Sequence, residues 1–98
     1  MAKFVYLYTG GQMAEGPEAQ EKAMQEWGAW FGSLGDSVTD MGNPFGSSTA
    51  VGADKATAAL TGYSVVTADS LDAAAVLAKD CPILANGGNV EIYEAIEM

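Results

Sequence analysis

The sequence predicts an α+β fold in which one antiparallel sheet carries two helices on one face. Short segments rich in aromatic and β-branched residues lie near both ends and in the middle of the chain, as is typical of strands. Two segments between them have apolar residues at helical spacing, and glycine, proline and asparagine separate these elements. The 98 residues form one domain, 1–98, with one core of modest size.

The first strand is predicted over residues 3–8, where side chains alternate between the two faces of the sheet. One face receives the aromatic residues Phe4, Tyr6 and Tyr8. The other receives Val5 and Leu7, so both faces are apolar and we expect both to be covered by protein.

The segment 16–35 predicts a helix that begins at Pro17 and ends at Gly35. Gly28 and Gly32 lie four residues apart on this helix, and we interpret them as sites of close packing. The apolar stripe of the helix consists of Ala23, Met24, Trp27, Trp30, Phe31 and Leu34.

The middle of the chain has the weakest pattern. Residues 36–41 predict a strand that ends near Asp40, residues 42–48 predict turns, and residues 49–55 are assigned to a short edge strand.

The last third predicts a strand over 63–67, a helix that ends at about residue 80, a turn over 86–89 and a strand over 90–95. Asp69 is expected to cap the helix, and Pro82 follows its end. The buried face of this helix is assigned to Leu71, Ala74, Ala75 and Ala78. The complete order β-α-β-β-α-β is that of a ferredoxin-like sandwich.

Such a sandwich leaves one face of its sheet bare. The residues assigned to that face are Phe4, Tyr6, Tyr8 and Tyr93. In water they would form an unusually large apolar patch. We therefore expect a homodimer in which two sheets pack face to face.

Composition excludes several kinds of partner. With four Lys and Arg against 13 acidic residues, the net charge is −9. This sign disfavours nucleic acid and anionic membranes. One cysteine, no signal-peptide pattern and no apolar stretch of membrane-spanning length predict a cytoplasmic protein. Cys81 is interpreted as a small buried apolar residue rather than a reactive thiol.

The residue types restrict the chemistry. The chain has no histidine and one cysteine, so common zinc sites and Ser-His-Asp or Cys-His arrangements are excluded, and we expect no metal and no cofactor. Asp40 is the candidate catalytic residue because it follows a strand beside a turn, where a general acid or base can face a cleft. The alternative for Asp40 is a solvated or turn-capping carboxylate.

A small molecule is the expected ligand, held between the sheet and the first helix. The candidate ligand-binding residues are Tyr6, Tyr8, Trp27, Trp30, Met41, Asn43 and Tyr63. Two further interpretations stay open: a cofactor-free enzyme in which Asp40 and a tyrosine transfer protons, and a purely structural dimer.

Several segments resemble the YCII-related proteins: Gly62-Tyr63-Ser64-Val65-Val66, Ser70-Leu71-Asp72-Ala73-Ala74, Cys81-Pro82 and Gly87-Gly88-Asn89-Val90-Glu91-Ile92. The resemblance covers the C-terminal third closely and the first strand and helix loosely. It implies a dimeric α+β barrel in which two ferredoxin-like sheets face each other. Many relatives carry a DGPF-type loop, and the nearest segment here is Asn43-Pro44-Phe45-Gly46. A catalytic His–Asp pair suggested for part of the family does not carry over, because this chain has no histidine.

Overall fold

The computed structural model describes residues 2–10, 16–49, 51–52 and 60–96. In chain order the elements are β1 (Ala2–Thr9), α1 (Gly16–Leu34), the 3₁₀ helix η1 (Gly35–Ser37), β2 (Val38–Asp40), β3 (Leu60–Ala68), α2 (Leu71–Ala78), α3 (Pro82–Ala85) and β4 (Asn89–Ala95).

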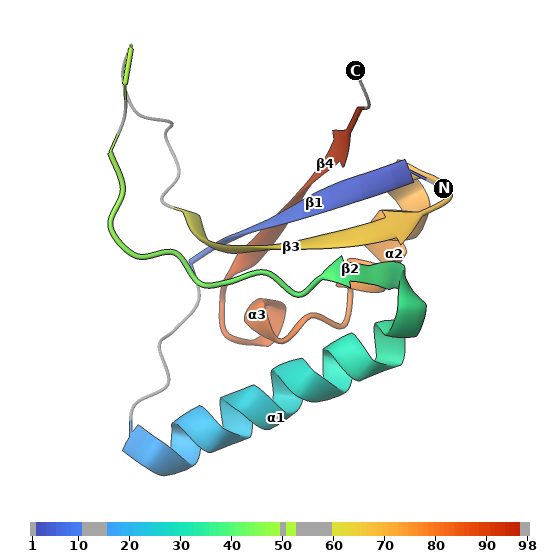
Figure 1. The fold of residues 1–98 in the computed structure, drawn as a ribbon. Helices are drawn as coiled ribbons and strands as arrows, with labels where there is room; N and C mark the ends of the chain where they lie inside the picture. The colour runs from blue at the N-terminus through green and yellow to red at the C-terminus, as the bar shows by residue number, and fades with distance from the viewer. Residues whose placement is uncertain (1, 11–15, 50, 53–59, 97–98) are drawn as a thin grey trace.

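The four strands form one sheet in the order β2-β3-β1-β4, and every neighbouring pair is antiparallel. The three α-helices of the described residues lie on one side of this sheet (Figure 1). The predicted α+β class with an antiparallel sheet is therefore confirmed, and the arrangement is compatible with the ferredoxin-like type.

Local structure differs from the sequence prediction at several places, and β3 begins three residues earlier than predicted, at Leu60. In the segment 36–41, where a strand was expected, the first residues belong to the 3₁₀ helix η1. The strand β2 that follows contains only three residues, Val38–Asp40. The cap of α2 is Ser70 rather than Asp69, because the Ser70 side chain accepts the N–H of Ala73 at 3.1 Å. Pro82 also begins a further short helix, α3, since its missing N–H costs nothing in a first turn.

The edge strand expected over 49–55 cannot be compared as a whole. Residues 50 and 53–55 lie outside the described residues, and residues 49, 51 and 52 belong to no strand.

The assignment of the aromatic face of β1 was wrong. Phe4, Tyr6 and Tyr8 lie on the helix side and are buried in the core. Alternation along a strand shows which residues share a face but not which face the helices cover. Of the four residues predicted for the bare face, only Tyr93 lies there, because it pairs with Val5 in the register between β1 and β4 and is 55% exposed.

Helix α2 packs on the sheet through alanines. Ala74 and Ala78 are buried as predicted, whereas Leu71 is 51% exposed. Small side chains let the helix approach the sheet closely, and Leu71 in the first turn lies outside the contact.

Gly28 and Gly32 of α1 do not pack closely against another part of the described chain. A methyl group added at Gly28 or at Gly32 would meet nothing within 4 Å among the described residues. Gly42 is the opposite case. It has a φ of 78°, and a methyl group there would lie 1.6 Å from the carbonyl oxygen of Tyr63. The chain after β2 therefore depends on glycine at this position.

We predict that Gly42→Ala destabilises the protein by at least about 2 kcal/mol, because it adds left-handed backbone strain to a steric clash with β3. Gly28→Ala is the matched control and should stabilise the protein by about 0.5–1 kcal/mol through helix propensity alone. Urea unfolding measures both changes. A destabilising Gly28→Ala would show that another molecule packs against that side of α1.

Candidate functional site

A layer of five aromatic rings lies between α1 and the sheet. Tyr6 stacks on Trp30 with ring centroids 6.1 Å apart, and Tyr8 meets Trp27 edge-on at 5.2 Å. Phe31 contacts both tryptophans, at 5.9 Å from Trp27 and 4.9 Å from Trp30. Aromatic rings at these separations attract one another beyond their area burial, so the layer fixes α1 against β1.

Three polar side-chain atoms in this layer, those of Tyr6, Tyr8 and Trp30, have hydrogen-bond partners. The Tyr6 hydroxyl donates to the backbone oxygen of Ala74, and Trp30 Nε1 donates to the backbone oxygen of Leu77 at 3.1 Å. The Tyr8 hydroxyl donates to Ser64 Oγ at 2.7 Å. With Tyr6 and Trp30 almost wholly buried, the inner part of the layer is filled by protein. Tyr6 and Trp30 therefore act as core residues in this chain.

Burial shifts the titration of three groups in and near this layer. Desolvation, with a smaller contribution from Cys81, raises the pKa of Tyr6 to about 12. Desolvation also raises the pKa of Tyr8, against a smaller lowering by its hydrogen bond with Ser64. Burial raises the pKa of Cys81 to about 11. At neutral pH the thiol is protonated and buried, which confirms the interpretation of Cys81 as a buried apolar residue.

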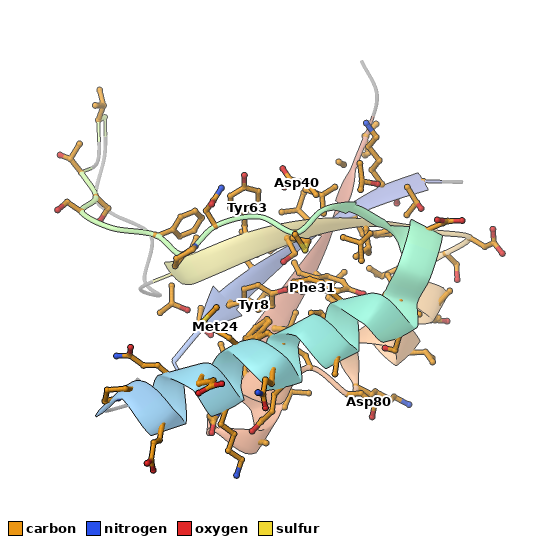
Figure 2. The ribbon with its side chains drawn as sticks, turned by 60° about the horizontal axis from the view of Figure 1, so that its bottom comes forward. Tyr8, Met24, Phe31, Asp40, Tyr63 and Asp80 are labelled. Atoms are coloured by element: carbon orange, nitrogen blue, oxygen red, sulfur yellow. The ribbon has the colours of Figure 1, made fainter. Side chains whose placement is uncertain are left out.

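The outer part of the layer is less well covered. Figure 2 shows Met24 and Phe31 on the side of α1 that is turned toward the sheet, where Tyr8 also lies. Met24 is nevertheless 75% exposed, and Trp27 and Phe31 are only partly buried. Among the described residues, apolar side chains at this end of the layer thus face the sheet without being enclosed by it.

The segment after β2 runs along the edge of β3. Ser64 Oγ donates to the backbone oxygen of Met41 at 2.7 Å, and the N–H of Tyr63 donates to the backbone oxygen of Asn43 at 3.3 Å. Further along, the N–H of Phe45 donates to the backbone oxygen of Thr61 at 2.8 Å. Met41 and Asn43 contribute backbone oxygens to these bonds while being exposed residues.

On the other side of the sheet, Asp40 and Tyr63 form a second polar cluster (Figure 2). Asp40 Oδ1 accepts the N–H of Gly42 at 2.8 Å, and the Tyr63 hydroxyl lies 3.5 Å from Asp40 Oδ2. Phe45 stacks on the Tyr63 ring with centroids 5.7 Å apart. The carboxylate therefore has the turn-capping role that was one of its two expected readings, with a phenol beside its second oxygen.

The predicted site residues are thus divided between the two sides of the sheet. Tyr6, Tyr8, Trp27 and Trp30 lie together on the helix side. Asp40 and Tyr63 lie on the opposite side, so the carboxylate does not converge with the buried tyrosines.

Sequence reasoning missed Ser64, which links the two groups. The alternation of β3 could have revealed it, because Ser64 lies between the helix-facing positions Gly62 and Val66.

An open groove of about 550 Å³ lies on the far side of Trp30, between α1 and the chain around α3. Its lining includes Glu26, Trp30, Ser33, Lys79, Asp80 and Leu84. The carboxylates of Glu26 and Asp80 and the amine of Lys79 carry opposite charges in this groove. It therefore favours neither an anionic nor a cationic ligand.

The described part of the chain shows neither a metal-binding group nor a membrane-spanning helix. It holds no group of three or more histidine, cysteine, aspartate or glutamate residues placed to bind a metal ion. None of its helices combines the length and apolar character needed to cross a membrane.

Fold and site together define a small α+β protein with an aromatic layer on one side of its sheet and an Asp–Tyr pair on the other. Comparisons with family models, with curated proteins and with solved structures gave no match for this chain. The resemblance to the YCII-related proteins therefore stays a prediction.

We predict that stability falls as the pH rises from about 9 to about 12. Over this range the Tyr6 hydroxyl and the Cys81 thiol lose their protons in the unfolded chain before they lose them in the folded one. The ordinary pKa values are 10.0 for tyrosine and 9.0 for cysteine, against about 12 for folded Tyr6 and about 11 for folded Cys81. In Tyr6→Phe the fall in the free energy of unfolding between these pH values should be smaller by on the order of 2 kcal/mol. Urea unfolding at several pH values measures it, and a flat profile across this range would contradict the burial argument.

Proposed function

We propose that the protein binds a small apolar molecule between its sheet and α1, and that it does so as a homodimer formed through the side of the sheet opposite the helices. The exposure of Met24 carries the first part of this proposal. An apolar side chain directed toward the sheet and still 75% exposed indicates an apolar surface that another molecule can complete.

The chemistry around Met24 favours a neutral or cationic ligand. Trp27 and Phe31 offer partly exposed ring surfaces, which bind apolar groups and cations. The net charge of −9 repels anions over the whole molecule. An uncharged molecule that carries a ring or a short hydrocarbon is the best match for these properties.

The second part of the proposal rests on the sheet face that none of the described helices covers. Val5 and Val65 pair directly at its centre, with Tyr93 beside Val5 on β4 and Leu7 further along β1. The valines and Leu7 are only half-buried, and Tyr93 is 55% exposed. A second copy packed on this face would cover them, as in the dimeric barrel that the YCII resemblance implies.

Proton transfer by Asp40 and Tyr63 is a second candidate function. The approach of the Tyr63 hydroxyl to Asp40 Oδ2, at 3.5 Å, favours it, because the pair lies on the face that the proposed dimer would enclose. A ligand that is recovered chemically changed after incubation would support catalysis, whereas one recovered intact would support binding alone.

We predict that Met24→Lys weakens binding of phenylnaphthylamine, a neutral apolar fluorophore, by about tenfold or more, because burying the new ammonium beside the ligand is unfavourable. Fluorescence titration of the dye, with quenching of tryptophan fluorescence as a second signal, measures the affinity. Stability should stay within about 0.5 kcal/mol of the original, since the replaced side chain is exposed.

Val76→Lys is the matched control for this experiment. Val76 is also an exposed apolar helix residue, at 58% exposure, but it lies on α2. Dye affinity should not change in this variant. Equal weakening in both variants, or none in Met24→Lys, would place the dye elsewhere and contradict the proposed site.

We predict that the protein has twice its chain mass of 10.1 kDa in solution and that Val65→Lys reduces it to a monomer. A lysine at the centre of the proposed interface would meet its copy across the two-fold axis. Light scattering coupled to size-exclusion chromatography measures both masses.

Leu71→Lys serves as the control because Leu71 is 51% exposed on α2, on the helix side of the sheet. It should remain dimeric. If the original protein is a monomer, the dimer proposal fails while the ligand proposal can still stand on the dye titration.

A further inference from the structure

We infer that Ser64 is a positioning residue that connects the aromatic layer on the helix side of the sheet to Asp40 and Tyr63 on the other side. The inference deepens the proposed function, on which it rests for the ligand that would act on the layer. Its structural part, the connection itself, can be tested without any ligand.

The first step is the direction of the two hydrogen bonds at Ser64. Its side chain is fully buried, at 0% exposure, and Oγ has two partners, Tyr8 Oη at 2.7 Å and the backbone oxygen of Met41 at 2.7 Å. A hydroxyl carries one proton, and a carbonyl oxygen can only accept. Ser64 therefore donates to Met41, and Tyr8 must donate to Ser64. The direction of this relay is fixed by chemistry.

The second step concerns the segment that receives the relay. The Met41 carbonyl lies between Asp40, whose carboxylate holds the N–H of Gly42, and Asn43, whose oxygen accepts the N–H of Tyr63. Ser64 thus holds residues 40–43 from the helix side, while the Asp40 carboxylate holds the same turn from the opposite side. The close approach of Gly42 to the Tyr63 backbone leaves little room for the turn to shift without moving Tyr63.

The third step is the start of the relay. The Tyr8 ring meets the edge of Trp27 at 5.2 Å, and Trp27 is one of the partly exposed rings beside Met24. A molecule that binds against Trp27 would therefore also affect the Tyr8 ring, whose hydroxyl donates the first hydrogen bond of the chain Tyr8–Ser64–Met41. Because coupling between two sites is reciprocal, a contact that changes the Asp40–Tyr63 side would also change affinity on the helix side.

Amide hydrogen exchange followed by NMR on the whole chain tests the connection. Ser64→Ala should speed exchange at Gly42 and Tyr63 by about tenfold, because the Met41 carbonyl loses its donor and the turn loosens. Tyr8→Phe should speed exchange at the same two amides by a smaller factor, since Ser64 keeps its own proton for Met41. This second variant preserves the test if Ser64→Ala does not fold.

Two matched controls separate this connection from a general loss of stability. Tyr6→Phe removes an equally buried hydroxyl from the same layer, but that hydroxyl bonds Ala74 in α2. Thr67→Val removes another β3 hydroxyl that bonds a backbone oxygen, that of Ser37 at 3.4 Å. Exchange at Gly42 and Tyr63 should match the original protein in both. Unchanged rates in Ser64→Ala and Tyr8→Phe, or equal acceleration in Tyr6→Phe, would overturn the inference.

Adding phenylnaphthylamine tests whether ligand binding on the helix side affects the turn at Gly42 and Tyr63. Bound dye should shift the Gly42 and Tyr63 amide signals in the original protein and leave them in place in Ser64→Ala. Dye that binds without moving these signals in the original protein would overturn the coupling but not the binding proposal. If no dye binds, the proposed function fails at this point, and the variant comparison alone decides on the connection.

Discussion

The burial of two tyrosine hydroxyls is the constraint on which most of this structure depends. Tyr6 and Tyr8 carry polar atoms into the core, where an unpaired hydroxyl costs about 1–3 kcal/mol. Tyr6 finds its acceptor on α2 and Tyr8 finds its acceptor on β3. The Tyr6 bond holds α2 against β1, the Tyr8 bond joins β1 to β3, and the tryptophan rings that pack on both tyrosines hold α1.

The same constraint divides the chemistry of the molecule. The tyrosines of β1 are used in the core, whereas Tyr63 with Asp40 and Tyr93 with Glu91 form polar pairs on the side that the described helices leave uncovered. Ser64 is fully buried, and its hydroxyl bonds Tyr8 on the helix side and the backbone oxygen of Met41, the residue next to Asp40. Binding on the helix side and the arrangement of Asp40 and Tyr63 on the other side are therefore proposed to be linked.

Particular elements show how far sequence reasoning reached. The alternation in β1 grouped Tyr6 with Tyr8, and the apolar spacing around Trp27 and Trp30 grouped the rings of α1, but the face of β1 was assigned to the wrong side of the sheet. The turn chemistry after Asp40 was also identified, including a capping role for its carboxylate. Met24 shared the stripe of α1 by spacing but is exposed, because spacing along a helix does not show where the sheet beneath it ends.

The sequence by itself determined the α+β class, the grouping of side chains along β1 and the absence of histidine chemistry, because these follow from local periodicity and composition. Only the tertiary structure decided which face of β1 the helices cover, since period-two alternation is symmetric between the faces. It also placed Asp40 and Tyr8 on opposite sides of the sheet, with Ser64 on the helix side bonded to Tyr8 and to the backbone of Met41. Hydrogen bonds between residues 23 and 56 positions apart depend on strand register, and no local pattern contains that information.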